Sequence, residues 1–448
     1  MTKQETNSEI VQETEQETVT SLDHFNNAFD EIFQYIQLPE DTQRALKATS
    51  LIKGGTSILV GLPGTAKTTL IEMLAGVFNL EWAKITCAPE KVTLEGSFYR
   101  LDIPTLMTGE EKIIWKKIAN ADFLFISEIN RAPQSFQDEL IDLLQYREFE
   151  AYGEIKKIKS HALAFLDMNW YRGGLDKAIS DRPRSMIAFP SPDFPARLRI
   201  SQQRFNKRSL TDLRKEVVPK ATLEDLIKCQ EEVEKIEIDK TALLIATLIT
   251  ESFSTCLYKR SHASERWIPP CFEDQLEVLG KIDTNITPKC SYLGEICSCV
   301  KIPMAYRLDE SLLLMAKSLA YLDGQTTVFE NEDFNHITEA LKHVVGNRLE
   351  LRDSIAQHWV NASDWVTNEL YNYLNKHKLK QWARAIDCFA TISEGTAKHS
   401  QHSIERAKTQ LQTFANKNLE LRPLAIAVNI TEFKNKEYGK DDKDNDEA

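Results

Sequence analysis

Short hydrophobic runs alternate with amphipathic segments over the first half of the chain. Five of these runs contain few polar positions, and they cover residues 57–60, 83–86, 123–126, 162–166 and 186–189. A strand that is covered on both faces has this pattern, whereas a half-exposed strand alternates apolar and polar residues. Helical patterns separate most of the runs. Strands and helices in alternation predict right-handed crossovers and an α/β fold with a parallel sheet between two layers of helices.

Helical periodicity dominates the chain from about Thr222 onward. Thr222 and Asp225 form a capping signal in front of Leu226, which indicates the start of a helix. The pattern predicts three consecutive parts: an α/β core over residues 22–195, a helical region over 196–352 and a further helical segment over 353–433.

The two ends of the chain have the composition of disordered tails. Residues 1–21 are rich in Glu, Gln and Thr, and residues 434–448 are charged almost throughout. Segments of this kind bury too little apolar surface to offset the entropy that a chain loses on folding. We therefore expect the folded part to lie between them.

Composition and charge narrow the possible functions. The 448 residues are 42% hydrophobic, which is enough for cores in two or three domains. The formal net charge is -12, so no domain-wide basic surface is available to bind a nucleic-acid backbone. We find neither a signal pattern at the N-terminus nor a stretch of roughly 18 apolar residues that could span a bilayer. The sequence predicts a cytoplasmic protein without nucleic-acid partners or membrane insertion.

A phosphate-binding loop lies between a predicted strand and a predicted helix. The predicted nucleotide contacts are Gly61, Pro63, Gly64, Thr65, Ala66, Lys67, Thr68 and Thr69. A glycine-containing loop at a helix N-terminus directs several backbone N–H groups at one point, as the phosphates of a nucleotide require. Lys67 would add a positive charge, and the Thr68 hydroxyl would bind Mg²⁺. ATP and Mg²⁺ are therefore the predicted cofactors.

Ala66 departs from the common form of this loop, which has glycine at that position. We expect Ala66 to keep a negative φ, because the left-handed region is strained for any residue with a Cβ. Alanine is usual at this position in the MoxR-type AAA+ ATPases, and the loop from Gly61 to Thr68 resembles theirs. The resemblance extends over about residues 25–350, and it implies an α/β core followed by a helical lid.

A second candidate site follows the run at 123–126. A hydrolytic P-loop ATPase needs an acid at the end of a neighbouring strand to hold Mg²⁺, and AAA+ proteins place beside it a Glu that polarises the attacking water. Glu128 fits the second role. Ser127 stands where the acid is usual, and it would contact Mg²⁺ only through water and more weakly than a carboxylate. The run from Ile129 to Pro133 closely resembles the family sequence after the acidic pair, which supports this alignment.

The resemblance implies three further nucleotide contacts. Asn169 matches sensor 1, an Asn that binds the γ-phosphate or the attacking water. Arg182 and Arg184 lie in a segment similar to the one that carries the arginine finger, which reaches the nucleotide of a neighbouring copy. Pro183 replaces the family's Phe, so the choice between the two arginines stays open, with Arg182 preferred. Arg307 matches sensor 2, which contacts the nucleotide of its own copy.

The resemblance breaks in an insertion at about residues 256–300. This segment contains His262 and five cysteines, which are Cys256, Cys271, Cys290, Cys297 and Cys299. Zinc could order such a segment, but no Cys-x-x-Cys pair is present, so we favour buried free thiols. In the C-terminal segment we expect core or subunit contacts at Ile355, Trp359, Trp365, Leu370, Tyr373 and Leu374.

Two classes of function compete. MoxR-type proteins are chaperone-like machines that remodel or assemble other proteins, often together with a protein that carries a von Willebrand factor A domain. The resemblance thus implies a homo-oligomeric ring, expected to be hexameric, which hydrolyses ATP between its copies. The alternative is an ATP-gated regulatory scaffold with little hydrolysis, because Ser127 replaces the metal-organising acid. A motor acting on nucleic acid is disfavoured by the acidic net charge.

Overall fold

The computed structural model describes residues 20–87, 92–169, 175–205, 217–255, 296–328 and 335–430. Within these residues no helix is both long enough and apolar enough to cross a lipid bilayer. The predicted N-terminal tail, residues 1–21, is too long at its C-terminal end, since Thr20 and Ser21 belong to the first helix and its cap. Ser21 begins a helix, because the Thr20 side chain accepts a hydrogen bond from the Asp23 N–H and Asp23 bonds back to Thr20. The other predicted tail residues, 1–19 and 434–448, lie outside the described residues.

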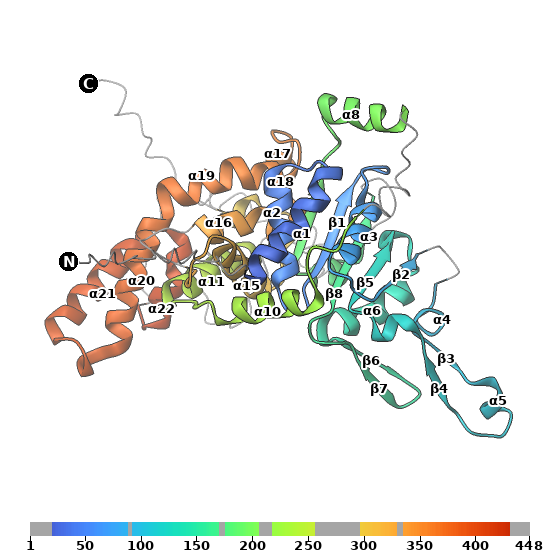
Figure 1. Cartoon of the computed structure of the whole chain (residues 1–448). Coiled ribbons are helices and arrows are strands. Elements are labelled where there is room, and N and C mark those ends of the chain that lie inside the picture. The colour runs from blue at the N-terminus through green and yellow to red at the C-terminus, as the bar shows by residue number, and fades with distance from the viewer. Residues whose placement is uncertain are drawn as a thin grey trace, which may run out of the picture.

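A five-stranded parallel sheet forms the centre of the α/β core (Figure 1). Its strands are β1 (Thr56–Gly61), β2 (Trp82–Thr86), β5 (Phe123–Ser127), β8 (Leu163–Met168) and β9 (Ser185–Phe189). Their order across the sheet is β2-β5-β8-β1-β9, with every pair parallel. Each predicted run forms a strand, and the α/β prediction is confirmed. Because all five strands run in one direction, the sheet has a carboxyl edge, where the strands end, and an amino edge, where they begin.

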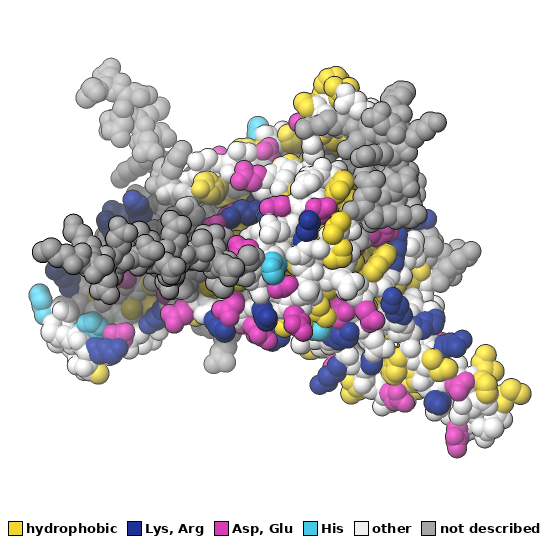
Figure 2. Space-filling model, in the orientation of Figure 1, with side chains coloured by type: hydrophobic (Ala, Val, Ile, Leu, Met, Phe, Trp, Pro, Cys, Tyr) yellow, Lys and Arg dark blue, Asp and Glu magenta, His cyan; other side chains and the backbone are white. Residues whose placement is uncertain are grey.

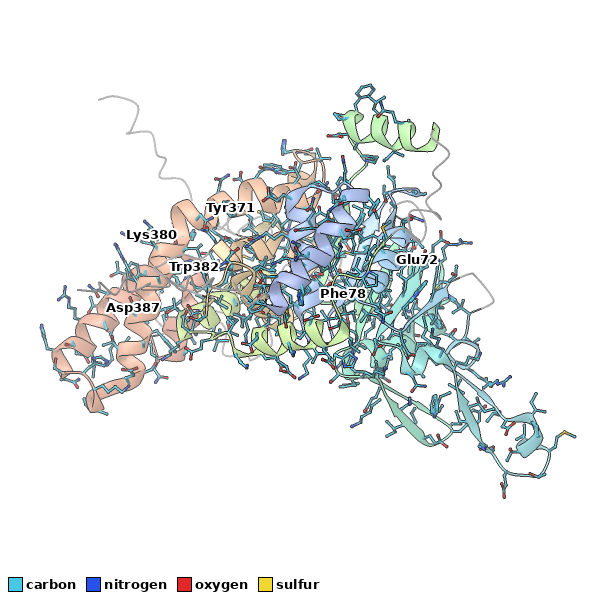
Figure 3. The ribbon with its side chains drawn as sticks, viewed as in Figure 1. Glu72, Phe78, Tyr371, Lys380, Trp382 and Asp387 are labelled. Carbon is cyan, nitrogen blue, oxygen red and sulfur yellow. The ribbon has the colours of Figure 1, made fainter. Side chains whose placement is uncertain are left out.

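Helices cover both faces of the sheet. On one face lie α1 (Ser21–Tyr35), α2 (Glu40–Leu51) and α3 (Lys67–Val77). They share a core with Phe123 and Phe165, whose rings are 5.4 Å apart. Phe78, labelled in Figure 3, follows α3, and the centre of its ring lies 5.6 Å from the centre of the Phe25 ring in α1. The other face carries Leu124 and is covered by α6 (Gln134–Tyr146). The predicted three-layer arrangement is therefore present.

Several short elements connect these layers. They are α4 (Leu94–Phe98), η1 (Lys117–Asn120), η2 (Ile129–Arg131) and α7 (Lys177–Ser180).

Two antiparallel hairpins extend from the core at the lower right of Figure 1. β3 (Tyr99–Leu101) pairs with β4 (Ile113–Trp115), and α5 (Ile103–Leu106) lies in the loop between them. β6 (Glu148–Ala151) pairs with β7 (Glu154–Lys157). The turn residues Tyr152 and Gly153 both have positive φ, at 47° and 76°, as a tight two-residue hairpin turn requires. The sequence analysis did not identify either hairpin, because strands of three or four partly exposed residues form no long apolar run.

A helical region follows the core and packs against the face covered by α2 and α3. Its packed elements are α10 (Leu223–Lys235), α11 (Lys240–Ser254), α14 (Ile296–Cys299), α15 (Leu308–Leu322), α16 (Asn335–Leu341) and the π-helical turn η3 (Lys342–Gly346). α8 (Phe194–Phe205) precedes them and projects away from the rest of the fold in Figure 1. The predicted capping box is confirmed, since the Thr222 side chain accepts from the Asp225 N–H. α15 packs against α2, α10 and α11, so this region shares one hydrophobic core with the sheet.

The C-terminal segment is helical, as predicted. It comprises α17 (Asp353–Ala356), α18 (Ala362–Trp365), η4 (Val366–Leu370), α19 (Tyr371–Tyr373), η5 (Leu374–Lys378), α20 (Leu379–Glu394), η6 (Gly395–Ala397), α21 (Gln401–Lys417), η7 (Leu419–Leu421) and α22 (Arg422–Ala427). α20 packs against α21 and against α11 of the helical region. Trp382, labelled in Figure 3, is fully buried in α20.

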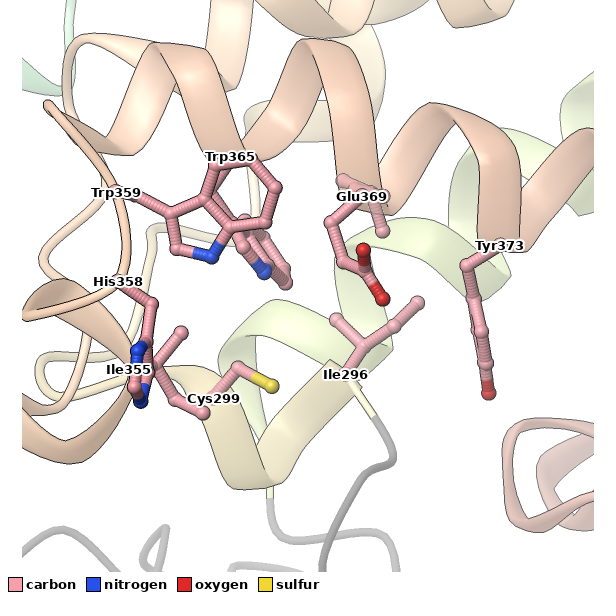
Figure 4. A pocket seen from close by; sticks show the side chains of 9 residues that line it. Ile296, Cys299, Ile355, His358, Trp359, Trp365, Glu369 and Tyr373 are labelled. Carbon is pink, nitrogen blue, oxygen red and sulfur yellow. The ribbon is translucent and has the colours of Figure 1, made fainter.

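The predicted apolar positions of this segment face the interior. Trp365, Leu370 and Leu374 are buried in the main core. Ile355, Trp359 and Tyr373 are partly buried and line a cavity of about 210 Å³ between the C-terminal helices and α14 (Figure 4). The prediction of core contacts is therefore confirmed for these six positions.

Two cysteines of the predicted insertion fall within the described residues. Cys297 and Cys299 of α14 are buried, and Cys299 borders the cavity in Figure 4. Cys256, Cys271, Cys290 and His262 lie outside the described residues, so the expectation about zinc stays a prediction.

Candidate nucleotide-binding site

The phosphate-binding loop lies at the carboxyl edge, where β1 ends at Gly61 and α3 begins at Lys67. The predicted order of strand, loop and helix is thus confirmed. Gly61 packs closely against β9, because a Cβ on it would lie 2.6 Å from the carbonyl oxygen of Phe189. Gly64 has a φ of 82°, which glycine adopts without strain. Apart from its two chain neighbours, no atom of the described residues lies within 4 Å of the Cβ position on Gly64, so the loop opens to free space there.

Ala66 lies in the left-handed region, with φ 65° and ψ 15°. The prediction of a negative φ was wrong. The Ala66 carbonyl already accepts the hydrogen bond from Leu70 N in the first turn of α3, at 2.9 Å. The turn from the loop into α3 therefore falls on Ala66 itself, and its φ reverses there. A non-glycine residue in this region costs about 1–2 kcal/mol, which the surrounding packing must offset.

Lys67 is buried inside the loop, with only 5% of its surface exposed. Its Nζ donates hydrogen bonds to the carbonyl oxygens of Gly61 at 3.0 Å and Leu62 at 2.9 Å. It also makes a longer contact of 3.4 Å with Asn169 Oδ1. Burial lowers the pKa of Lys67, although the neighbouring carboxylates oppose that shift. The ammonium group is thus held by neutral oxygens that the more strongly accepting oxygens of a phosphate could replace.

Thr68 and Thr69 are the second and third residues of α3. Thr69 is buried, so only its backbone N–H could serve a ligand, whereas Thr68 is half-buried. The N-terminus of this 11-residue helix carries partial positive charge and N–H groups without helical partners. An anionic phosphate fits this position.

Glu128 lies just beyond β5 and has a left-handed backbone, with φ 57° and ψ 46°. Its carboxylate forms an ion pair with Arg131, and its Oε1 accepts a hydrogen bond from Asn169 Nδ2 at 3.5 Å. About 29% of the Glu128 side chain is exposed, so a water molecule can approach it. The sequence analysis did not identify Arg131, although its three-residue spacing is the signal that the side chains meet in a short 3₁₀ turn.

Asn169 connects the two predicted sites. It contacts Lys67 through Oδ1 and Glu128 through Nδ2, and its own carbonyl accepts a hydrogen bond of 3.2 Å from Asn130 Nδ2. Three residues that the sequence singled out over a span of about a hundred positions are therefore in contact at one edge of the sheet.

Asp167 belongs to the same group and was not identified from the sequence. It is 6% exposed, and its Oδ1 accepts the Glu128 N–H at 2.5 Å. The Ser127 side chain lies beside this carboxylate and lowers its pKa. Burial raises the pKa of Asp167, while the hydrogen bonds and Lys67 oppose that rise. The signal in the sequence is an acid inside an apolar strand, since acids are rarely buried without partners.

The oxygens gathered here suit a magnesium ion. Thr68 and Ser127 offer hydroxyls and Asp167 offers a carboxylate, and Mg²⁺ is bound in proteins through one or two carboxylates, phosphates and retained waters. The open space at Gly64 leaves room for the phosphates beside them. The residues present therefore fit the predicted cofactors.

The candidate arginines Arg182 and Arg184 lie at the opposite, amino edge of the sheet. The backbone N–H of Arg184 donates to the carbonyl oxygen of Thr56, the first residue of β1, at 2.8 Å. β1 is six residues long, and a strand rises about 3.3 Å per residue, so Thr56 and Gly61 are about 17 Å apart. The two arginines are therefore separated from Lys67 by the length of a strand.

Arg307 lies with these arginines, not with Lys67. Its Nη1 donates to Gln145 Oε1 at 3.3 Å. Gln145, Arg182 and Arg184 line one surface cavity of about 320 Å³. Burial lowers the pKa of Arg182, and the charge of Arg307 lowers it further, as expected for guanidinium groups that lie close together.

The partners of the two finger candidates differ. Arg184 forms a double hydrogen bond with the Glu310 carboxylate of α15, at 2.7 and 2.8 Å. Arg182 donates from Nη1 to the Ala178 carbonyl, and its buried Nε has no partner among the described residues. Arg182 thus retains more capacity to bind an anion.

The helical region holds the segment that carries these arginines. Arg348 is buried and donates from Nη2 to the Pro183 carbonyl, and burial lowers the pKa of Arg348 to about 10. Asn347 donates from Nδ2 to the Met186 carbonyl at 2.8 Å. A shift of the helical region would therefore move the arginines with it.

Comparison with known families places the P-loop in a known type of domain. Residues 56–172 match the AAA domain of the dynein-related subfamily. The matched segment includes the loop at Gly61, as well as Glu128 and Asn169.

Two known proteins extend this comparison. Chaperone MoxR1 from Mycobacterium tuberculosis is 27% identical over 152 residues, which cover 32% of this chain and 39% of MoxR1. The chain therefore matches well under two thirds of that relative's length. The crystal structure of a candidate ATPase from Cytophaga hutchinsonii superimposes with a TM-score of 0.57 over 78% of this chain and 94% of that chain, at 16% identity, which shows a shared fold. The resemblance to MoxR-type AAA+ proteins is confirmed by these matches.

Proposed function

We propose that this chain, whose residues 56–172 match the AAA domain of the dynein-related subfamily, binds and hydrolyses ATP in a ring of identical copies. The free energy of ATP would drive the remodelling or assembly of a partner protein or complex. The resemblance suggests a protein with a von Willebrand factor A domain as one class of partner. A hexameric ring and a cytoplasmic location stay predictions.

The contact chain from Lys67 through Asn169 to Glu128 carries this proposal. A phosphate-binding cation, an amide and a carboxylate are brought together at the end of the P-loop strand. Hydrolysis of a phosphoanhydride needs these three groups, since one neutralises the phosphate, one orients the water and one accepts its proton.

Each residue then has a distinct task. Lys67 would leave the carbonyls of Gly61 and Leu62 and donate to the β- and γ-phosphate oxygens. Bound Mg²⁺ would withdraw charge from these oxygens. Glu128 would leave Arg131 and accept a proton from the attacking water, while Asn169 holds that water in line. The loop N–H groups from Gly64 onward would bind the phosphate chain.

The arginines of the amino edge would act on a neighbouring copy. Because about 17 Å of strand separates them from Lys67, they cannot reach the nucleotide of their own copy. Arg182 is the preferred finger, since Arg184 is held by Glu310. Arg307 lies beside Arg182, so we assign it to the neighbour's nucleotide as well, in place of the contact within its own copy that the sequence analysis expected.

The hairpin tips offer a surface for a partner protein. Ile103 and Met107 are 68% and 84% exposed at the tip of the hairpin β3–β4, where Figure 2 shows hydrophobic side chains at the far end of the molecule. Tyr152 and Ile155 are exposed on the hairpin β6–β7, and Tyr152 contacts Tyr99 of the first hairpin. Exposed apolar side chains gathered on a projection mark an interaction surface.

The alternative is an ATP-gated scaffold that scarcely turns over. The observation in its favour is Ser127, a neutral residue at the position that usually carries the metal-organising acid. In that case ATP would still bind at Lys67 and assemble the ring, but Glu128 would contribute little.

Steady-state ATP turnover separates the two functions. The assay compares the wild type with Glu128→Gln and Lys67→Ala, and ring formation is followed by mass photometry with and without ATP. We expect turnover in the wild type, binding without turnover in Glu128→Gln and neither in Lys67→Ala. Wild-type turnover no higher than that of Glu128→Gln, with ATP still bound, would contradict hydrolysis and support the scaffold.

A further inference from the structure

The acid that position 127 lacks is present on the neighbouring strand. β5 and β8 pair in parallel with Ile126 opposite Leu166, so Ser127 and Asp167 are the next positions across the pair. The Ser127 side chain faces the Asp167 carboxylate across this pair and helps to keep its pKa down. Neighbouring strands lie about 4.8 Å apart. A carboxylate on β8 and a hydroxyl on β5 can therefore serve one ligand between them.

Both side chains belong to the face of the sheet that α3 covers. Side chains alternate along a strand, and Phe125 and Phe165, two residues before Ser127 and Asp167, share a core with α3. β8 lies between β5 and β1, so Asp167 is closer to the P-loop strand than Ser127 is. The carboxylate thus lies on the same side of the sheet as Thr68 in the first turn of α3.

The Asp167 carboxylate retains capacity for another donor. An ionised carboxylate has about four acceptor sites, and the Glu128 N–H occupies one of them. Lys67 attracts Asp167, but its Nζ directs its hydrogen bonds to the oxygens of Gly61 and Leu62. In the described part of the chain, the charge of Asp167 is not neutralised by a direct ion pair.

We propose that Asp167 takes the place of the missing acid, so that its carboxylate accepts hydrogen bonds from the water shell of ATP-bound Mg²⁺ while Ser127 holds it in position. The inference rests on the proposed ATP site. A carboxylate supplies a full charge and two acceptor oxygens, whereas Ser127 alone would supply a neutral hydroxyl. Ser127 is then no longer a reason to doubt hydrolysis, because Asp167 on the neighbouring strand supplies the missing carboxylate.

The test is the gain in ATP affinity that Mg²⁺ provides. Calorimetry gives the dissociation constant of ATP for the full chain in Mg²⁺ and in EDTA, and the ratio of the two constants is compared between variants. Asp167→Asn should lower this ratio by about 10- to 100-fold, the usual effect of losing a residue that supports a metal. The affinity in EDTA should stay within about twofold of the wild type.

A second pair of variants tests the inference without the asparagine side chain, whose amide could itself interact with the Mg²⁺ waters. Asp167→Ser should lower the ratio of the two dissociation constants in the same way. Adding Ser127→Asp to this variant should restore the ratio, because it returns an acid to the other strand. EPR of Mn²⁺ bound with ATP gives a readout that requires no turnover, and it should follow the same order.

Three results have different meanings. If Asp167→Asn or Asp167→Ser has the same ratio of dissociation constants as the wild type, the inference is overturned. An equal loss of affinity in Mg²⁺ and EDTA would also overturn it, because Asp167 would then act only as the counter-ion of Lys67. A wild type that binds no ATP in either condition would instead contradict the proposed function itself.

Discussion

The Nζ atom of Lys67 lies 3.4 Å from Asn169 Oδ1, so the cation of the P-loop touches the polar residue at the end of a strand a hundred residues later. Asn169 uses its other amide atom on Glu128, at 3.5 Å. One amide thereby bridges the cation that we propose to hold the phosphate and the carboxylate that we propose to activate the water.

Removal of this amide should slow hydrolysis without preventing binding. Asn169→Ala deletes a donor aimed at the reacting water, and the loss of one such donor costs about 10²- to 10³-fold in kcat. Asn169→Asp is the informative control, because its carboxylate would hold Lys67 in an ion pair and so weaken ATP binding. Turnover by wild type and variants, together with ATP affinity, checks both. An unchanged kcat in Asn169→Ala would exclude Asn169 from the site.

Arg131 should restrain the resting enzyme. Its ion pair with Glu128 must open before that carboxylate can act, and a partly exposed pair is worth about 0.2–1 kcal/mol. Arg131→Met should therefore raise basal turnover by up to about fivefold. Lys408→Met, which removes the lysine of a partly exposed ion pair with Glu405 at the same three-residue spacing on α21, serves as the control and should leave turnover unchanged. A fall in turnover in Arg131→Met would show that Arg131 assists catalysis.

Mixed rings should reveal which copy supplies the arginine. Arg182→Ala should bind ATP but lose about 10³-fold or more of its turnover. Lys67→Ala should not bind ATP, yet it still carries Arg182. Mixtures of the two inactive variants should regain turnover, because some interfaces then combine a sound P-loop with a sound arginine. No recovery in mixtures that form rings of normal size would rule out action across the interface. Arg184→Ala should lose less than Arg182→Ala.

Ala66→Gly should stabilise the protein, against the usual trend. Glycine normally weakens a structure through chain entropy, but at φ 65° it also removes the strain of a Cβ, which is about 1–2 kcal/mol. We expect a net gain of up to about 1 kcal/mol in the ATP-free protein. Thermal unfolding of wild type and Ala66→Gly without nucleotide measures it. Ala75→Gly, within α3, is the matched control and should destabilise.

His343 should make the fold sensitive to acid. Burial lowers its pKa to about 3, and the neighbouring Lys342 adds to the shift. Below the unfolded pKa of about 6.5 the unfolded chain binds a proton that the folded chain refuses, so stability falls as pH falls. Between pH 7.5 and 5 this amounts to about 2 kcal/mol. His343→Gln should lose less stability over the same range, measured by denaturant unfolding at both pH values; equal losses would contradict a buried neutral His343.

The strands of the sheet were predictable because a strand buried on both faces needs a continuous run of apolar residues. A helix of the same length needs apolar residues on one side only. Glu128 and Asn169 could be placed for a related reason, since the ends of parallel strands meet at one edge. The role of Asp167 could not be foreseen from spacing. Its partner Glu128 follows another strand, and only the register of β5 against β8 brings the two residues into contact.

The predictions at Ala66 and Arg307 show a different limit. The φ of Ala66 is decided by the entry into α3 and not by the residue's own preference. The position of Arg307 depends on how the helical region docks on the core, through contacts such as the one between Asn347 and Met186. Docking of one region on another is set by many weak contacts, none of which leaves a local pattern in the sequence.

The separation of Lys67 from Arg182 along β1 has a consequence for how such a protein is switched off. Under the proposed function, a lone copy would hold two incomplete halves of a site at opposite edges of the sheet, so dilution alone would silence it even when ATP is plentiful. Its ATP turnover would then depend on the concentration of the protein as much as on the concentration of ATP. A defective copy that still enters the ring would disable a neighbour whose own P-loop is intact.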